Sequence, residues 1–434
     1  MKKIVSFFYL FLVFSCCKNN TEDIYTNKPV EVVFWHAMSG LIGDILNELV
    51  DEYNSTHPGV VIKAQCMGNY NALSQKLMAS IVAKNQPDIA QAYEAWIARF
   101  KAGNLLVPFD SFFTNEKEKF SLFKDFFPVI LSNNLYNGEL FSLPFNKSTP
   151  IIYYNKDMFK KAGLDPEKPP EDWDEFLTVA KIITKKLNVK GFVSGLDTSE
   201  IECFIYQNGG RISSEKTPSK MDFASVETVE AIKFLLEMKY LHKVAEYYPG
   251  SGYEYQNNFL SQQSAMMITS CVSRTYMADR LVFDWGMAPL LKRKRKGGII
   301  YGTNIVLFNK TKGLKRKAAW DFISWFISPE IQLRWALKTG YLVVRRSCLA
   351  LPEMKDQLKR LPSLEKIIRQ IEDGFFDPRT TEWFLGRQNL GKTIMDIFSS
   401  PVIAKECVSG NTEKVSSLVM KELNKACYNT EKWF

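Results

Sequence analysis

The sequence predicts an α/β protein with two domains, and three observations support this prediction. The chain has 434 residues, which is long for a single hydrophobic core. From residue 30 onward, strand-like and helix-like segments alternate, a pattern typical of a parallel sheet covered by helices. The same alternation starts again after Tyr154, which indicates a second sheet.

The first domain is expected to begin with strands and helices in turn. The segments VEVVFWH, HPGVVIKAQ and DIAQAY have the composition of strands, and residues 41–53 and 73–81 carry apolar side chains at helical spacing. Ligands bind such sheets at the carboxyl ends of the strands. We therefore expect His36, residues 68–70 and residues 93–94 to lie together at one edge.

The second domain is expected to begin at the strand IIYYN, directly after the polar patch NKST between two prolines. GFVSG, SAMMITS and IIYGTNIVLF are further predicted strands, and residues 226–236 and 320–326 have apolar faces at helical spacing. The segment WGMAPL, residues 285–290, is expected to cross between the domains. From about residue 345 the chain is predicted to be mostly helical.

The amino terminus carries the features of an export signal. Two lysines precede a short apolar run, residues 4–14, which is too short for a permanent transmembrane helix. The small residue Ser15 follows this run, as expected at the end of a secretory signal. We therefore predict a signal peptide over residues 1–15 and a polar tether over residues 16–29. No later apolar stretch has the length needed to cross a membrane.

Cys16 is the predicted lipidation site, because VFSC resembles a bacterial lipobox. Cys17 is the alternative, and an ordinary secretory signal with incidental cysteines is the other interpretation. A lipid anchor would hold the protein in the cell envelope, on the periplasmic or the extracellular face of a bacterial membrane.

Composition argues against several classes of protein. The net charge of +9 is spread along the chain, and the basic run KRKRK beside two glycines is expected to be a solvated turn. The chain lacks the interleaved aromatic and basic residues typical of nucleic-acid binding. With three histidines and no cysteines at metal-ligand spacing, no metal or other cofactor is predicted. Export would permit a disulfide, for which Cys407 and Cys427 are one candidate pair, and buried free cysteines are the alternative.

Several segments resemble the extracellular solute-binding proteins of ABC importers, in the branch that contains sugar binders. They include FWHAMSG, GNYNALSQKL, AQAYEA, LPFNKSTPIIYYNKDMFKKAGLDP, SAMMITS and KTGYL. The resemblance covers roughly residues 30–400, and FWHAM, GNY and AYE are similar to the glycerol-phosphate binders of that branch.

The resemblance implies a periplasmic-binding-protein type II fold. Two discontinuous α/β lobes then hold the ligand in a cleft between them and close on it by hinge motion. The implied lobes are residues 30–142 with 290–330, and residues 143–289 with 331–434. The implied partners are a permease and a small solute, without catalysis and without a stable oligomer.

The resemblance also implies a ligand-binding set. A phosphate ester needs hydroxyls, backbone N–H groups and often a guanidinium, and a carboxylate suits the glycerol hydroxyls. Ser273, Lys392 and His36 are weaker candidates. The implied ligand residues are Tyr70, Glu94, Ser148, Ser270, Gly302, Tyr341 and Arg387.

The sequence departs from the family at two places. Lys147 stands where the family has a small polar residue, and we expect its side chain to point to solvent, although it could add charge near a phosphate. The acidic segment 197–202 replaces an aromatic-rich segment whose tryptophan would cover the glycerol. The ligand could therefore be glycerol-3-phosphate or a larger diester such as glycerophosphocholine.

Three other functions are alternatives to binding of a glycerophosphate. A sugar or oligosaccharide binder of the same fold would line its cleft with aromatic rings and carboxylates. An exported phosphodiesterase would need an activated nucleophile or a metal-bound water, and no serine–histidine pattern or metal cluster is visible. A surface adhesin that keeps the fold is the third.

Overall fold

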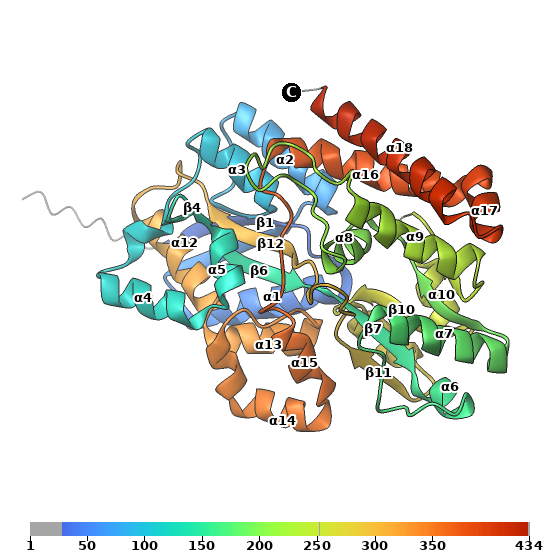
Figure 1. Cartoon of the computed structure of the whole chain (residues 1–434). Helices are drawn as coiled ribbons and strands as arrows, with labels where there is room; N and C mark the ends of the chain where they lie inside the picture. The colour runs from blue at the N-terminus through green and yellow to red at the C-terminus, as the bar shows by residue number, and fades with distance from the viewer. Residues whose placement is uncertain (1–27, 251, 433–434) are drawn as a thin grey trace, which may run out of the picture.

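The computed structural model describes residues 28–250 and 252–432 (Figure 1). The predicted signal peptide, Cys16 and most of the tether lie outside the described residues. Two five-stranded sheets confirm the predicted α/β class with two lobes. Among the residues described, no helix combines the length and apolar character needed to span a bilayer.

The first sheet forms the centre of one lobe. Its strand order is β2 (Val60–Cys66), β1 (Val30–His36), β3 (Ile89–Ala92), β12 (Tyr301–Leu307) and β6 (Leu143–Ser148). Strands β1, β2 and β3 are parallel as predicted, and β12 runs antiparallel to both of its neighbours. The helices of this part of the chain are α1 (Gly40–Thr56), α2 (Tyr70–Val82), α3 (Glu94–Ala102), α4 (Glu116–Asp125), α5 (Pro128–Asn134) and α12 (Gly313–Phe326), and a hairpin of β4 (Leu135–Tyr136) and β5 (Glu139–Leu140) precedes β6.

The second sheet forms the centre of the other lobe. Its order is β11 (Trp285–Ala288), β7 (Pro150–Asn155), β10 (Ser264–Ser270), β8 (Lys190–Ser194) and β9 (Ala245–Tyr247). Strand β7 is antiparallel to β10 and β11, whereas β8 is parallel to β9 and β10. The helices that follow these strands are α6 (Lys156–Lys161), α7 (Trp173–Leu187), α8 (Thr198–Gln207), α9 (Val226–Tyr240), α10 (Glu254–Leu260) and α11 (Ser273–Met277).

The carboxyl-terminal part of the chain is helical, as predicted, and divides between the lobes. α13 (Pro329–Thr339) packs on the first lobe, because Arg334 and Lys338 form ion pairs with α1. α14 (Pro352–Arg360) and α15 (Ser363–Arg369) follow it in Figure 1. The last helices share an apolar core with the second lobe: α16 (Thr381–Ser399), α17 (Pro401–Val408) and α18 (Thr412–Glu431).

The chain passes between the sheets at a different point from the expected boundary. The resemblance implies a second lobe from residue 143, but β6 pairs with β12 in the first sheet. The chain changes sheets at Thr149, directly before the strand IIYYN with which the sequence pattern predicts that the second lobe begins. The polar patch forms a strand because Asn146, Lys147 and Ser148 pair with residues 301–303 of β12. The expected start of the second lobe at residue 331 also differs from the position of α13 on the first lobe.

Gln370 ties the crossing segments together. Its side chain donates to the Thr149 hydroxyl at 2.9 Å and to the Pro150 carbonyl at 3.1 Å. Its Oε1 accepts from the backbone N–H of Leu290 at 2.6 Å. Thr149 and Pro150 belong to the first crossing and Leu290 to the second, while Gln370 itself lies on the path from α15 to α16. One buried amide therefore links the segments about which the lobes would hinge.

Replacing Gln370 with leucine is expected to lower the free energy of unfolding by roughly 1–3 kcal/mol, because buried partners lose their hydrogen bonds. Urea denaturation followed by circular dichroism measures this change. Gln388→Leu is the control, since Gln388 is exposed on α16. Equal effects of the two substitutions would contradict the assigned role of Gln370.

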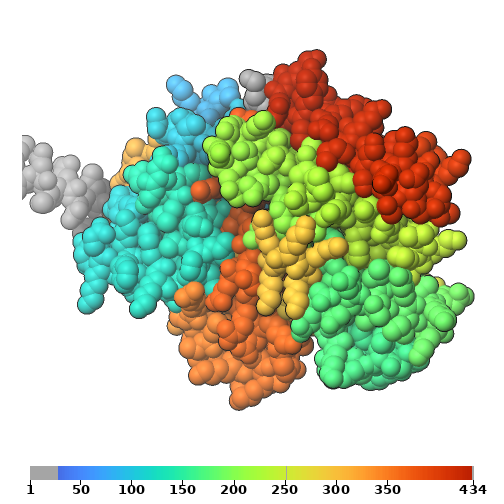
Figure 2. Space-filling view, in the orientation of Figure 1, coloured from blue at the N-terminus to red at the C-terminus, as the bar shows by residue number. Residues whose placement is uncertain are grey.

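The structure tests the expected disulfide and the expected exposure of the basic run. The proposed disulfide is wrong: Cys407 and Cys427 are free thiols against the second-lobe core, where burial raises the pKa of both to about 11. The basic run, residues 292–296, is largely exposed as expected (Figure 2). Arg293 also stacks 4.7 Å from the ring centre of Trp173, so this turn is partly anchored.

Candidate ligand site between the sheets

The topology brings the ends of both sheets face to face. The carboxyl ends of β1, β2, β3 and β6 meet the amino end of β12 at one edge of the first sheet. In the second sheet, the carboxyl ends of β8 and β10 meet the amino end of β7. Only Thr149 separates the end of β6 from the start of β7, so these two edges are adjacent where the chain crosses between the sheets (Figure 1). Loops that follow these strands therefore converge on one region.

The GNY segment shows how local sequence places a side chain at this edge. Gly68 adopts a φ of +96°, a conformation that favours glycine. Asn69 then caps α2, because its side chain accepts from the Ala72 N–H at 3.0 Å. Tyr70 is consequently the first residue of α2, and its ring meets that of Tyr93 edge-on at 5.0 Å. The predicted clustering of residues after β2 and β3 is confirmed.

Asn146 joins two of the predicted ligand residues. Its Nδ2 donates to the phenol oxygen of Tyr70 at 3.0 Å and to that of Tyr341 at 2.9 Å. Its Oδ1 accepts from the Thr303 N–H at 2.9 Å, which fixes the orientation of the amide. Burial raises the pKa of both phenols, so they stay neutral donors at physiological pH. Tyr341 also stacks on Trp335, with ring centres 5.7 Å apart.

Glu94 and Lys147 form a buried ion pair at the same edge. Lys147 has no exposed surface, and its ammonium donates to Glu94 Oε1 at 2.7 Å and to the Gly302 carbonyl at 3.3 Å. Asn304 Nδ2 donates to the same carboxylate oxygen at 3.1 Å. The expectation that Lys147 points to solvent is wrong, because the glycine opposite it in β12 leaves room for its side chain to reach α3.

Gly302 is required by the close approach of two strands. Its φ is +110°, and a Cβ at this position would lie 1.8 Å from the Asn146 carbonyl oxygen. The predicted contribution of its N–H to a ligand remains a prediction.

The two predicted serines lie on opposite sides of the crossing. Ser148 is buried at the end of β6 and pairs with Tyr301 of β12. Ser270 ends β10, is partly exposed, and lies beside the Tyr301 phenol, whose pKa burial raises well above its usual value. Ser273 is less suited to a ligand, because its hydroxyl already lies 3.1 Å from Thr269 Oγ1 and 3.3 Å from Gln256 Nε2.

Arg387 lies on α16 and is already engaged by acidic side chains. Its guanidinium donates to Glu202 Oε1 at 2.8 Å, to Asp377 Oδ2 at 3.4 Å and to Ser199 Oγ at 2.7 Å. Its side chain is 34% exposed, whereas the rival Lys392 is exposed on the same helix. Burial raises the pKa of Glu202 well above its usual range, and Asp377 raises it further. Arg387 is therefore already paired with two acidic side chains in the absence of a ligand.

His36 packs within the first lobe. Its Nδ1 accepts from the Met38 N–H at 3.2 Å, and its ring centre lies 5.3 Å from that of Phe34. Burial lowers its pKa to about 4, so it is neutral near pH 7. Within residues 28–250 and 252–432, no group of three or more His, Cys, Asp or Glu side chains is placed to hold a metal ion.

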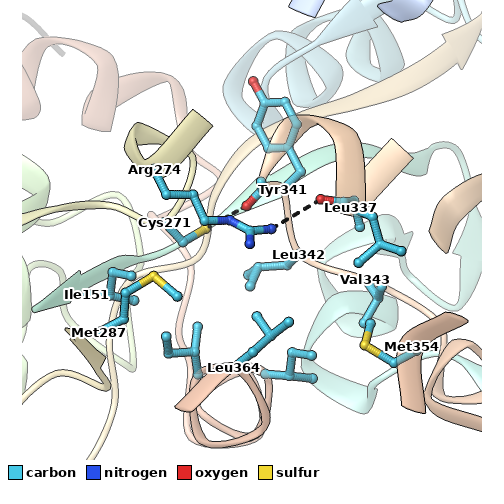
Figure 3. A pocket seen from close by; sticks show the side chains of 14 residues that line it. Ile151, Cys271, Arg274, Met287, Leu337, Tyr341, Leu342, Val343, Met354 and Leu364 are labelled. Carbon is cyan, nitrogen blue, oxygen red and sulfur yellow. Dashed lines mark hydrogen bonds between the residues drawn. The ribbon is translucent and has the colours of Figure 1, made fainter. Parts of the chain in front are cut away.

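A small apolar cavity lies behind Tyr341, on the hinge side of the site (Figure 3). It holds about 20 Å³, room for roughly one water molecule. Arg274 reaches across it and donates to the Ala336 carbonyl at 3.5 Å, which links the second lobe to the end of α13. This cavity is too small for a glycerophosphate, so it belongs to the hinge packing.

Sequence reasoning missed Asn146 and Tyr301 as members of this region. Asn146 lies in the quoted segment PFNKSTP, and its strand partner on β12 is the signal that would have drawn attention to it. That pairing is not visible from one segment alone, because more than 150 residues separate the strands in the sequence.

The chain is similar in sequence to known bacterial proteins. It matches the family of bacterial extracellular solute-binding proteins over residues 48–362. It is 28% identical over 384 residues to the sn-glycerol-3-phosphate-binding periplasmic protein UgpB of Pectobacterium atrosepticum, covering 84% of this chain and 85% of that protein. It is 30% identical over 387 residues to the protein of the same name from Salmonella typhimurium, covering 84% and 86% respectively.

Solved structures share the fold. The cyclic alpha-maltosyl-1,6-maltose binding protein of Arthrobacter globiformis superposes with a TM-score of 0.75 at 22% identity, covering 93% of this chain and all of that one. UgpB of Mycobacterium tuberculosis, solved in complex with glycerophosphocholine, gives 0.73 at 20% identity, covering 91% and 98%. These likenesses confirm the predicted type II periplasmic-binding-protein fold. With the match to the family over most of its length, the chain belongs to the bacterial extracellular solute-binding proteins of ABC importers.

Proposed function

We propose that this protein binds glycerol-3-phosphate or a glycerophosphodiester between its lobes and delivers it to an ABC permease without catalysis. The observation that carries the proposal is that hydroxyl groups lie at the facing edges of both sheets, while α16 of the second lobe carries the Arg387 guanidinium. Tyr70 and Tyr341 share the Asn146 amide on the first lobe, and Ser270 lies on the second. The sequence similarity to glycerol-3-phosphate-binding proteins supports the same ligand class.

The balance of charge around Arg387 favours a diester over a monoester. Asp377 and Glu202 already engage the guanidinium, which leaves it less able to offset a second negative charge on the ligand. A phosphodiester carries one negative charge, whereas a phosphomonoester carries about 1.5 to 2 at pH 7. Bringing the smaller charge out of water costs less, because the desolvation of an ion rises with its charge. Glycerophosphocholine is therefore expected to bind more tightly than glycerol-3-phosphate.

A sugar or oligosaccharide is the second candidate, and a specific observation favours it. Aromatic rings gather at the site, where Trp335 stacks on Tyr341 and Tyr70 meets Tyr93. Rings of this kind pack well against sugars, and the Glu94 carboxylate could accept from their hydroxyls.

The proposal extends to the cell envelope. Cys16 would carry the lipid that anchors a monomeric protein to the bacterial membrane, with Cys17 as the alternative. Mass spectrometry of the amino-terminal peptide from membrane fractions would identify the modified cysteine, and a Cys16→Ala variant that is still lipidated would point to Cys17.

Isothermal titration of the mature chain with glycerol-3-phosphate, glycerophosphocholine and maltose tests the ligand class. We expect both phosphate esters to bind, and binding of maltose alone would contradict the proposal. Ser270→Ala is expected to weaken binding of the phosphate esters by roughly 1–3 kcal/mol, since a hydroxyl bonded to a charged group is lost.

The control for this variant is Ser55→Ala, because Ser55 is exposed near the end of α1. It should leave the affinity unchanged. If Ser270→Ala also has no effect, Ser270 does not contact the ligand.

A further inference from the structure

We propose that Lys147 is an internal counter-ion that cancels the charge of Glu94 and so allows the site to accept an anionic ligand. This inference rests on the proposed function, because it matters only if the ligand is anionic. It assigns Lys147 a role in specificity that acts through Glu94, as a positioning residue that does not touch the ligand.

The geometry keeps the Lys147 ammonium away from any ligand. The residue is fully buried, and its Nζ is held by Glu94 Oε1 at 2.7 Å and by the Gly302 carbonyl at 3.3 Å. The same Nζ lies 5.1 Å from the ring centre of Phe376, a favourable position for a cation over an aromatic face. Its positive charge therefore acts on its neighbours, and the nearest of them is the Glu94 carboxylate.

Glu94 lies where a ligand would meet it. It is the first residue of α3, at the edge of the first sheet that faces the second lobe, and it keeps 7% of its surface exposed. Both hydrogen bonds from Lys147 and Asn304 fall on Oε1. The carboxylate can thus accept from a ligand hydroxyl through Oε2 while Lys147 compensates its charge.

Without that compensation, Glu94 would repel a phosphate. Two like unit charges about 7–10 Å apart, at an effective dielectric constant of about 20, repel strongly enough to weaken binding by roughly 10- to 60-fold. Arg387 does not supply a surplus of positive charge, because it is bonded to Asp377 and Glu202. The cation in direct contact with Glu94 is Lys147, so Lys147 is the group that compensates its charge.

The test is titration calorimetry with glycerol-3-phosphate between pH 6.0 and 8.5, on the wild-type chain, Lys147→Met and the double variant Lys147→Met with Glu94→Gln. In Lys147→Met, a buried carboxylate without its cation is protonated more readily, so it ionises as the pH rises. Its affinity is expected to fall with pH relative to the double variant, reaching roughly 10- to 60-fold weaker binding at pH 8.5. The titrations are repeated with glycerophosphocholine, whose phosphodiester keeps one negative charge over this range, because ionisation of glycerol-3-phosphate would itself increase its repulsion from Glu94.

Other titratable groups near Glu94 do not change charge over this range. The phenols of Tyr93 and Tyr136 face Glu94, and burial raises the pKa of both. Arg379 stacks 4.7 Å from the ring centre of Tyr136, Arg387 lies near Tyr93, and an arginine stays charged at these pH values. The pH trend of Lys147→Met can therefore be assigned to Glu94.

The outcomes separate the two proposals. A wild-type chain that binds no phosphate ester overturns the proposed function and this inference with it. Wild-type binding, with Lys147→Met binding the phosphate esters as tightly as the double variant even at pH 8.5, overturns the inference alone. If Lys147→Met does not fold, the Glu94→Gln variant is compared with the double variant instead. Glu94→Gln removes the negative charge and keeps the Lys147 cation, so it should bind glycerol-3-phosphate more tightly at pH 6.0 than the double variant does. Equal affinities of these two variants would overturn the inference.

Discussion

Replacing Lys147 with methionine is expected to lower the free energy of unfolding by about 3–5 kcal/mol, the usual cost of removing one partner of a buried ion pair. Methionine fills a similar volume, so little of this loss comes from a cavity. The loss comes from the Glu94 carboxylate, which keeps its buried position and its bond from Asn304 but loses the ammonium at 2.7 Å. Urea unfolding at pH 7 measures the change.

Two controls show whether the cost comes from the unpaired charge. The double variant, with Glu94→Gln added, should recover most of the lost stability, because no buried charge is then left alone. Lys63→Met removes a partner from the exposed pair of Lys63 and Glu31, whose side chains are 51% and 46% exposed, and should cost less than about 1 kcal/mol. If Lys147→Met costs no more than Lys63→Met, the buried pair is not a source of stability.

Replacing Gly302 with alanine is expected to lower the free energy of unfolding by roughly 3 kcal/mol or more. A backbone conformation that non-glycine residues rarely adopt costs about 1–3 kcal/mol by itself. The added methyl group would also meet the Asn146 carbonyl at 1.8 Å, which forces β6 and β12 apart. Because Asn146 orients Tyr70 and Tyr341, ligand binding should weaken along with stability. Thermal unfolding and titration calorimetry measure the two effects.

Gly250→Ala is a control that separates the cost of the backbone conformation from the cost of the steric clash. Gly250 has a similar φ of +128°, but apart from Gly250 and its chain neighbours no described atom lies within 4 Å of the position its Cβ would take. It should therefore show the cost of the backbone conformation alone, and Gly302→Ala should exceed it. Equal losses in the two variants would mean that the close approach of β6 and β12 can relax.

The local pattern of the sequence was sufficient for most of the secondary structure. Alternating apolar runs predicted β1, β2 and β3 with the helices between them, because strand and helix periodicities differ within a short window. The same pattern placed residues 68–70 and 93–94 after strands, and parallel strands end at one edge, so Tyr70 and Tyr93 meet as expected. Motifs in the chain also pointed to the family to which it belongs.

The polar patch NKST shows where a local pattern is insufficient. Its polar residues between prolines are typical of a loop, yet Asn146, Lys147 and Ser148 form the end of β6, because β12 supplies their strand partners from more than 150 residues away. Hydrogen bonding to a distant strand outweighs local preference, since β propensity depends strongly on tertiary context.

Thus the sequence by itself determined the class of fold, the order of the strands along the chain and the residue types at their ends. Only the tertiary structure decided which of those residues act together: Lys147 with Glu94, Asn146 with two tyrosines, and Arg387 with two acids. The physical reason is that a charge or a hydrogen-bonding group responds to whatever lies within a few ångströms of it. In this protein those neighbours come from the insertion of β12 between β3 and β6 and from the return of α16 to the second lobe.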